Sequence, residues 1–364
     1  MKNLFFSILL FLAFIAVSAQ PGSADFIPCE KIVAMEDFSF DVIGNFPDRW
    51  STNATGEIAK IEGREGNWLK PLKNGVFMPE FITNLPENFT LEFDVACSAD
   101  FSYYSSFLSF AFAAMANPAK EFVNWKDLNT AGRTGIITGI HPKNASGNSG
   151  MTNVLVFDNG IEMIKKEANQ KQLFSGNKLL VHISIWRQNQ RLRLYYNEEK
   201  VWDLPLAFDT RLKYNRMLFQ TGSFWSEGDS YYISNMLLAV GAPDTRNKFL
   251  TEGRFITHGI LFNPNSDTIR PESNAAIKEI AAVLNENADT RVKITVHTEN
   301  DGDAASSLAL SIHRAVAIKN YLSTVFNIGA SRMETDGKGD TQPLEKNTTL
   351  EGKANNRRVE FIKM

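Results

Sequence analysis

The sequence predicts a chain of two domains, an all-β antiparallel sandwich followed by an α+β domain of order βαβαβ. Residues 38–241 show short strand-like alternation broken by prolines and Gly/Asn turns, whereas residues 253–364 also show apolar residues at helical spacing. A length of 364 residues leaves room for two such cores. The two periodicities meet in the polar stretch 242–252, which we expect to be an inter-domain linker.

Near the start of the chain, Lys2 precedes an apolar run over residues 4–17, which leads into the small residues Ser18 and Ala19. This pattern is typical of a secretory signal peptide, and we expect residues 1–19 to be removed. The run is shorter than the roughly 20 residues that span a bilayer. The first cysteine, Cys29, lies ten residues past Ala19 (29 − 19), so a lipid anchor is not expected. The mature protein is expected to be exported.

Cys29 and Cys97 are the two cysteines of the chain. An oxidising compartment would permit a disulfide that joins the start of the mature chain to a later strand. Sequence does not show whether the two side chains are adjacent in space, so two buried free thiols remain open as well.

The composition, 43% hydrophobic and 22% charged, is that of a soluble globular protein. A net charge of −3 and the absence of a basic run argue against a nucleic-acid partner. No Cys, His or carboxylate spacing around His297 or His313 matches a metal site. We therefore expect neither a metal nor a cofactor.

The first domain is predicted from short segments such as 91–95, 181–185 and 191–195, in which apolar residues alternate with polar or charged ones. Many short strands with turn residues between them predict a sandwich or a barrel. A charge on the lipid face of a membrane barrel costs about 2 to 4 kcal/mol at the bilayer midplane. We expect a soluble sandwich, with an outer-membrane barrel as the alternative.

Three segments, 45–50, 85–94 and 191–197, resemble those of concanavalin- or laminin-G-like jelly rolls. The resemblance implies a lectin-like binding domain over residues 20–241, with a glycan or an envelope protein as its partner. Exposed tryptophans could stack on sugar rings there, although most are expected to be core. The candidates are Trp50, Trp68, Trp125, Trp186 and Trp225.

Some jelly rolls of this type are glycoside hydrolases with paired carboxylates on one strand face, as Glu92 and Asp94 are placed. Retaining enzymes need two carboxyl groups about 5 to 5.5 Å apart, and the related enzymes carry a further Glu soon after. Here Val95-Ala96-Cys97 follows instead. We expect a wet strand face and no catalytic residue, with a wall-tethered polysaccharide-cleaving enzyme as the alternative.

The second domain is predicted from three strands and two amphipathic helices. An opening strand near 255–261, a middle strand over 292–296 and a last strand near 359–361 alternate apolar and polar residues. Between them two helices each show an apolar stripe. These stripes are Ile277, Ile280, Ala281 and Leu284, and then Ile312, Ala315, Ile318 and Leu322. Such an order places both helices on one face of a small sheet.

Four motifs of this region resemble the OmpA-like peptidoglycan-binding domain over residues 253–364. They are the loop Phe262-Asn263-Pro264-Asn265, the acidic Glu299 after His297-Thr298, Arg314 on the second helix, and the closing Asn356-Arg357-Arg358-Val359. The resemblance implies a ligand, the diaminopimelate side chain of uncrosslinked peptidoglycan stems. It therefore implies peptidoglycan as a partner.

The free end of that side chain carries an ammonium and a carboxylate on one carbon. A carboxylate and an arginine suit it, because a guanidinium binds a carboxylate through two parallel hydrogen bonds and stays charged. We expect Glu299 and Arg314 to hold the zwitterion. The further ligand-binding residues that we expect are Asn263, Asn265, Asn300, Ser307, Arg357 and Arg358.

Two departures from the family pattern bear on this site. The family usually has Asp where Glu299 stands, and Glu is longer by about 1.5 Å; the family also often has Asn near Ser307. Asp301 or Asp303 could substitute for the acid. The alternative is that Glu299 and Arg314 form an ordinary surface ion pair, which contributes about 0 to 1 kcal/mol.

Of Arg357 and Arg358, we expect one to brace the acidic loop and the other to be solvated. The sequence as a whole predicts a non-catalytic, exported envelope protein. We expect it in the periplasm, associated with the cell wall at the outer membrane.

Overall fold

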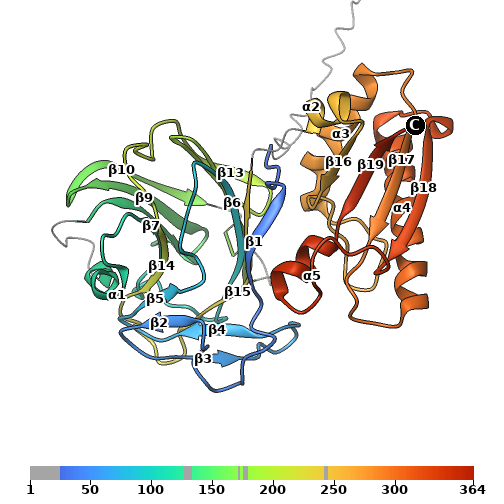
Figure 1. Cartoon of the computed structure of the whole chain (residues 1–364). Coiled ribbons are helices and arrows are strands. Elements are labelled where there is room, and N and C mark those ends of the chain that lie inside the picture. Colours follow the sequence, from blue (N-terminus) through green and yellow to red (C-terminus); the bar gives the residue numbers. More distant parts are fainter. Residues whose placement is uncertain (1–24, 127–132, 171–172, 175–178, 242–244) are drawn as a thin grey trace, which may run out of the picture.

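The computed structural model describes residues 25–126, 133–170, 173–174, 179–241 and 245–364. The predicted signal peptide at 1–19 lies outside the described residues. Within them the chain forms three sheets, two in a first domain and one in a second (Figure 1). No helix in this part of the chain is long and apolar enough to cross a membrane.

The first domain consists of two antiparallel sheets. The first sheet has the order β13-β12-β11-β6-β15-β4-β3, and β1 also pairs with β15. Its strands are β1 (Lys31–Glu36), β3 (Gly56–Ala59), β4 (Trp68–Pro71), β6 (Asn88–Cys97), β11 (Leu180–Gln188), β12 (Arg191–Tyr196), β13 (Glu199–Leu204) and β15 (Tyr231–Val240).

The second sheet has the order β10-β9-β8-β7-β14-β5-β2. Its strands are β2 (Trp50–Thr52), β5 (Val76–Pro79), β7 (Leu108–Ala113), β8 (Gly135–His141), β9 (Gly150–Asp158), β10 (Ile161–Gln170) and β14 (Arg216–Thr221). The short helices α1 (Pro118–Glu121) and η1 (Phe122–Lys126) follow β7.

Aromatic side chains from both sheets meet in the core of the first domain. The ring of Phe93 on β6 lies 5.1 Å from that of Phe110 on β7 and 5.2 Å from that of Phe219 on β14. All three are fully buried, and such edge-to-face pairs add to the free energy of area burial. The prediction of an antiparallel all-β domain is confirmed.

The two cysteines are free and buried, so the predicted option of a disulfide is wrong. The backbone N–H of Cys29 donates to Thr90 Oγ1 at 2.9 Å, near the start of β6. Cys97 ends the same strand. Seven strand residues (97 − 90) span about 23 Å, whereas a disulfide needs Cα atoms about 4.4 to 6.8 Å apart. The second option that the sequence left open, two buried thiols, is the one observed.

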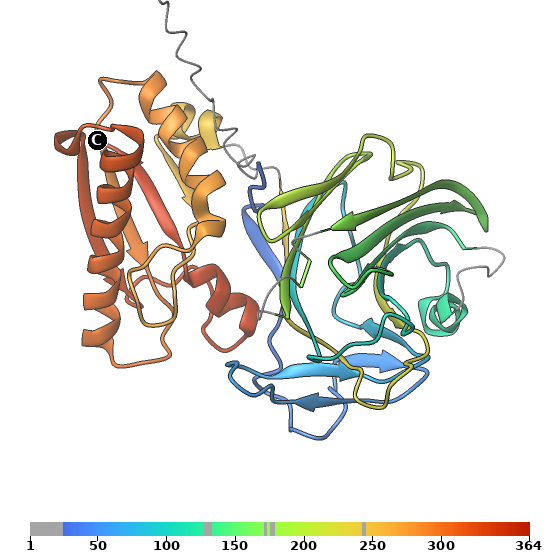
Figure 2. The ribbon, with the colours of Figure 1, turned by 180° about the vertical axis from the view of Figure 1, so that it is seen from behind.

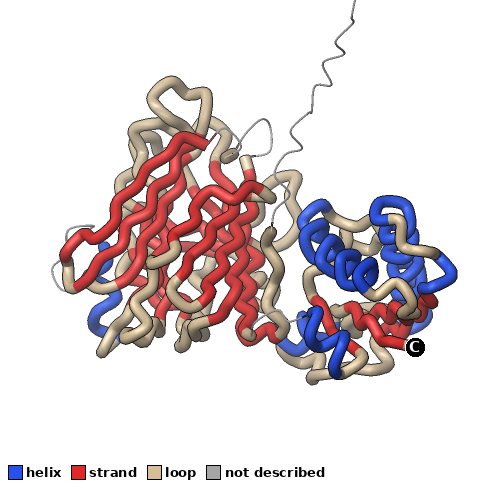
Figure 3. The backbone as a smooth tube through the Cα atoms, turned by 90° about the horizontal axis from the view of Figure 1, so that it is seen from above, coloured by secondary structure: helices blue, strands red, loops and turns tan. Residues whose placement is uncertain are grey.

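The second domain has a four-stranded sheet of order β16-β19-β17-β18, in which β17 and β18 are parallel. Its strands are β16 (Arg254–Thr257), β17 (Val292–His297), β18 (Met333–Gly339) and β19 (Val359–Lys363). Its helices are α2 (Thr245–Thr251), α3 (Asn274–Glu286), α4 (Ala304–Phe326) and α5 (Leu350–Asn356), with short 3-10 turns at η3 (Pro271–Ser273) and η4 (Ala330–Arg332). Figure 3 shows α3 and α4 stacked on one face of the sheet, as predicted.

The predicted order βαβαβ lacked β18 and α5. Strand β18 was not predicted because its sequence has no apolar alternation. Its buried positions are Met333, Gly337 and Gly339. The glycines allow close packing, since a Cβ on Gly337 would collide with the backbone of Ile312 in α4. Close approach of a helix to a strand is thus encoded by missing side chains rather than by apolar ones.

The predicted linker at 242–252 is also too long. Residues 245–251 form α2, and Phe249 in that helix is fully buried. Its ring lies 5.8 Å from that of Phe255 in the core of the second domain. The second domain therefore begins at α2, and helix α5 of this domain packs against β1 of the first (Figure 2).

Candidate functional site

A cavity of about 560 Å³ opens in the second domain where β17 ends and α4 begins. Such a volume is in the range of small-ligand sites. Six of the predicted ligand-binding residues line it: Asn265, Glu299, Ser307, Arg314, Arg357 and Arg358. Asn263 and Asn300 are not in its wall, although the carbonyl of Asn263 contacts Arg314.

Arg314 is held from three sides. Its Nε donates to the carbonyl of Ser266 at 2.9 Å and its Nη2 to the carbonyl of Asn263 at 3.4 Å. Its guanidinium lies 4.8 Å from the centre of the Phe262 ring, within cation–π range. A guanidinium has five N–H groups. The two contacts therefore leave the end-on fork of Nη1 and Nη2 available, and burial lowers the pKa of Arg314 without threatening its charge.

The loop that holds Arg314 is shaped by its own sequence. Asn265 adopts a left-handed backbone with φ of 49°, which Asn tolerates better than most residues. The N–H of Ser266 then donates to the carbonyl of Asn263 at 3.1 Å. This turn brings both carbonyls towards one guanidinium. The phenylalanine-led loop is thus a cradle for the arginine.

Glu299 pairs with Arg357 rather than with Arg314. Glu299 Oε2 accepts from Arg357 Nη1, and Oε1 has no hydrogen bond to another residue of the described chain. Glu299 and Arg314 form no ion pair with each other, although both line the cavity. The alternative of a plain Glu299–Arg314 pair is therefore not what the structure shows.

Of the two adjacent arginines, Arg357 braces the acidic loop, as predicted for one of them. The expectation that the other is solvated is wrong: Arg358 is 4% exposed. It donates to Glu360 Oε1 at 2.8 Å and to the carbonyl of Gln342 at 3.1 Å. His297, 3.3 Å from the same carboxylate, and Arg358 together hold the pKa of Glu360 at about 2. A buried arginine needs this partner because an unpaired buried charge is costly.

The two aspartates that could replace Glu299 are engaged elsewhere. Asp301 pairs with Lys353. Asp303 caps α4 by accepting from the N–H of Ser306 at 2.9 Å. Glu299 and Asp301 both line the cavity, and Glu299 keeps a carboxylate oxygen without a hydrogen-bond partner in the described chain.

Sequence reasoning missed two polar atoms and two apolar side chains of the cavity wall. His297 and Thr298 are 3% and 8% exposed, yet His297 Nδ1 and Thr298 Oγ1 have no hydrogen-bond partner among the described residues. Buried polar atoms without partners are rare in proteins. The apolar pair, Ile32 and Leu237, comes from the first domain. No local sequence pattern predicts that these two side chains line the cavity, because their position depends on how the domains dock.

The paired carboxylates of the first domain are not on a wet strand face. Glu92 and Asp94 flank His182, with Asp94 Oδ1 2.7 Å and Glu92 Oε2 3.2 Å from its ring nitrogens. The three side chains are between 12% and 17% exposed. Burial alone would lower the pKa of His182, but the hydrogen bonds to Asp94 and Glu92 raise it to about 10. The carboxylates serve as partners of a histidine cation.

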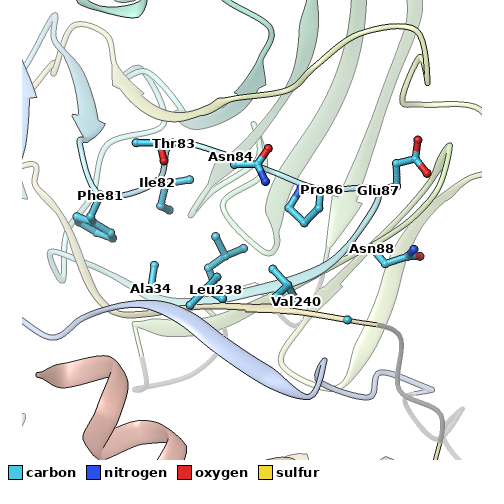
Figure 4. Close-up of a pocket in the computed structure, with 12 residues that line it drawn as sticks. Ala34, Phe81, Ile82, Thr83, Asn84, Pro86, Glu87, Asn88, Leu238 and Val240 are labelled. Carbon is cyan, nitrogen blue, oxygen red and sulfur yellow. The ribbon is translucent and has the colours of Figure 1, made fainter. Parts of the chain in front are cut away.

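A second cavity of about 570 Å³ lies inside the rim of the first domain, between β1, the end of β15 and the segment 81–88 (Figure 4). In Figure 4, Ile82 and Asn84 of the segment 81–88 lie on one side of it, and Leu238 and Val240 of β15 lie on the other. The residues that line this second cavity form no ion pair with one another. No cluster of three or more His, Cys, Asp or Glu in the described segments could hold a metal ion.

The second domain is an α+β domain with a charged cleft at one end of its sheet. Residues 261–357 match the OmpA family. The C-terminal part of the chain belongs to that family.

Curated relatives align with the same region. Over 110 residues the chain is 34% identical to outer membrane protein Omp38 of Acinetobacter baumannii. This alignment covers 30% of this chain and 31% of Omp38. Putative lipoprotein YfiB of Escherichia coli is 32% identical over 107 residues, covering 29% of this chain and 67% of YfiB. Peptidoglycan-binding protein ArfA of Mycobacterium tuberculosis is 31% identical over 103 residues, covering 28% of this chain and 31% of ArfA. The chain thus spans about a third of the length of Omp38 and of ArfA.

Proposed function

We propose that the second domain binds the diaminopimelate end of uncrosslinked peptidoglycan stems and anchors the first domain to the cell wall. One observation carries the proposal: a single cavity presents a carboxylate oxygen of Glu299 and the end-on fork of Arg314. That pair of groups suits one carbon bearing an ammonium and a carboxylate. A relative of this domain, ArfA, is named for peptidoglycan binding.

In this arrangement the ligand ammonium donates to Glu299 Oε1, and the ligand carboxylate accepts from Arg314 Nη1 and Nη2. Each charge-assisted contact contributes about 1.5 to 3 kcal/mol. The unpartnered Thr298 Oγ1 and His297 Nδ1 offer further contacts to the peptide. One stem is held modestly, and retention on the wall comes from many stems at high local concentration.

The longer acid at position 299 is accommodated by Arg357. Its guanidinium holds Glu299 Oε2, so the extra carbon–carbon bond does not leave the carboxylate loose. Fixing a rotamer before binding reduces the entropy lost on binding. Asp301 and Asp303 have no part in the proposed contact, since their side chains are engaged by Lys353 and by the start of α4.

The test is retention of the full chain on purified peptidoglycan, with a soluble diaminopimelate tripeptide as competitor. We expect the tripeptide to compete, and the same tripeptide with its diaminopimelate carboxylate amidated to compete at least about tenfold less well, since it loses about 1.4 kcal/mol or more. Arg314→Lys keeps the charge without the fork and should bind more weakly. Arg291→Ala, which removes an exposed arginine paired with Glu334, is the matched control. Equal competition by both tripeptides contradicts the proposal.

We infer further that the first domain is a lectin-like, non-catalytic binding module of the jelly-roll type. Of the five candidate tryptophans, only Trp225 is exposed, at 72%. Its ring lies 5.3 Å from that of Tyr104, which lies 5.5 Å from that of Tyr103. Buried Asp229 fixes both loops by accepting from the N–H of Ser102 and from that of Ser226. Rigid, amphipathic rings of this kind suit stacking against sugar faces.

An array of bacterial, plant and fungal polysaccharides tests the module. We expect binding to a subset of glycans, with a loss of at least about tenfold in Trp225→Ala and in Tyr104→Ala. Phe40→Ala, which removes another exposed ring of the same domain, should bind as the wild type does. Absence of glycan binding contradicts the glycan and leaves an envelope protein as the partner. Glycan binding that Trp225→Ala leaves unchanged contradicts the aromatic site. Together with the wall contact, we propose that the protein is located in the periplasm, associated with the cell wall at the outer membrane.

A further inference from the structure

Strand β1 of the first domain has a bulge that turns two of its side chains in opposite directions. Its pairing with β15 shifts between Ile32 and Ala34. Ala34 is buried in the sandwich core, whereas Ile32 belongs to a separate apolar cluster with Ala239 and with Ala354 of α5. In a regular strand residues two apart share a face, and a bulge is a known means of re-aiming a side chain. The strand thus presents apolar side chains to the second domain.

Side chains of helix α5 form hydrogen bonds with the backbone of this strand. Asn355 Oδ1 accepts from the N–H of Ile32 at 3.1 Å, and Asn355 Nδ2 donates to the carbonyl of Ile32 at 2.9 Å. Glu351 Oε1 accepts from the N–H of Met35 at 3.2 Å and from Arg49. The outward edge of β1 is therefore satisfied by the second domain instead of by another strand.

This contact reaches the ligand pocket along two routes. Ile32 and Leu237 of the first domain line the same cavity as the charged residues Glu299, Arg314 and Arg357. Arg357 follows α5 at once in the chain; its Nη2 lies 3.6 Å from Met35 Sδ while its Nη1 holds Glu299. The position of the acid therefore depends on a guanidinium that rests on the first domain.

We propose that the peptide site is shared by both domains: Ile32 and Leu237 form an apolar wall for the aliphatic part of the stem, and docking of β1 on α5 positions Arg357 and Glu299. This rests on the proposed binding of diaminopimelate stems. Ile32 and Leu237 are specificity-determining residues of the site, and Met35 and Asn355 are positioning residues. The first domain is then part of the wall-binding unit and not only its cargo.

The experiment measures the Kd of the full chain for the soluble diaminopimelate tripeptide. We expect Leu237→Ser and Asn355→Ala to raise the Kd about three- to tenfold, and Leu237→Met to restore it, since a thioether of similar volume keeps the wall apolar. Leu206→Ser is the matched control, because Leu206 is 70% exposed in the first domain and lies outside the cavity. It should leave the Kd unchanged.

Thermal unfolding of each variant shows whether the first domain remains folded. A Kd that is unchanged in Leu237→Ser and in Asn355→Ala, while Arg314→Ala loses binding, overturns the shared site and leaves the proposed function standing. If the wild-type chain does not bind the tripeptide, both the shared site and the proposed function are contradicted.

Discussion

The side-chain amide of Asn355 forms two hydrogen bonds with the main chain of Ile32, 323 residues earlier in the sequence. One amide thereby satisfies both backbone groups that a neighbouring strand would otherwise satisfy. Both residues are buried. This pairing joins the two domains at the point where the ligand cavity crosses from one to the other.

Replacement of Asn355 by Ala should destabilise the docked chain. Two buried backbone groups of Ile32 would lose their partners, at a cost of about 1 to 3 kcal/mol in the free energy of unfolding. Urea denaturation measures the change. Asn300→Ala, an exposed asparagine of the same domain, should change stability by less than about 0.5 kcal/mol. Equal stability of the two variants would show that the pairing does not hold the domains.

Gly337→Ala tests the close packing of β18 on α4. The added Cβ would meet the backbone of Ile312, so we expect a loss of about 1 to 3 kcal/mol and a lower Tm. Gly302→Ala is the matched control, since its nearest neighbour would be Ser307 Oγ at 3.9 Å. A Gly337→Ala protein as stable as wild type would mean that helix and strand are not in contact there.

The His182 cluster predicts how stability depends on pH. Its pKa is about 10 when folded, against about 6.5 in an unfolded chain. The stabilisation is therefore complete below about pH 6.5 and is lost as the pH rises towards 10. Glu92 and Asp94 face the ring from β6, and the charges of Arg270 and Glu272 act on the cluster from the second domain.

Urea unfolding near pH 6 and near pH 9.5 should show a wild-type loss that exceeds that of His182→Gln by roughly 3 to 4 kcal/mol. The difference between the two proteins isolates this group from other titrations. If the variant loses as much stability as the wild type, the histidine is not charged in the folded protein.

The free cysteines give a chemical prediction. Burial raises the pKa of the Cys29 thiol to about 11 and that of the Cys97 thiol to about 12. Both should react slowly with a thiol reagent in the native protein, because the thiolate is the reactive form. Unfolding without a reductant should expose two reactive thiols per chain. None would indicate a disulfide and a different course for the N-terminal segment.

Local periodicity was sufficient where one element buries its own face. The stripe of α3 and the alternation of β6 predicted those elements, and the closing motif led to Arg357 and Arg358. The stripe of α4 is confirmed for Ala315, Ile318 and Leu322, but Ile312 is 43% exposed and Ser311 is buried on that face instead. Local periodicity failed where a residue is buried by contacts with distant parts of the chain. Strand β18 packs closely on a helix because its buried positions include glycines. Arg358 is buried because it pairs with the carboxylate of Glu360. Ile32 faces the pocket because of a bulge in β1 and because the second domain docks there. These depend on tertiary contacts that no short window contains.

The central claim is that one zwitterion lies between Glu299 and Arg314. A crystal structure of the full chain soaked with diaminopimelate tests it most directly. We expect the ligand ammonium within about 3 Å of Glu299 Oε1 and the ligand carboxylate on Nη1 and Nη2 of Arg314. A ligand bound at saturation elsewhere, with Glu299 contacted by Arg357 alone, would contradict it.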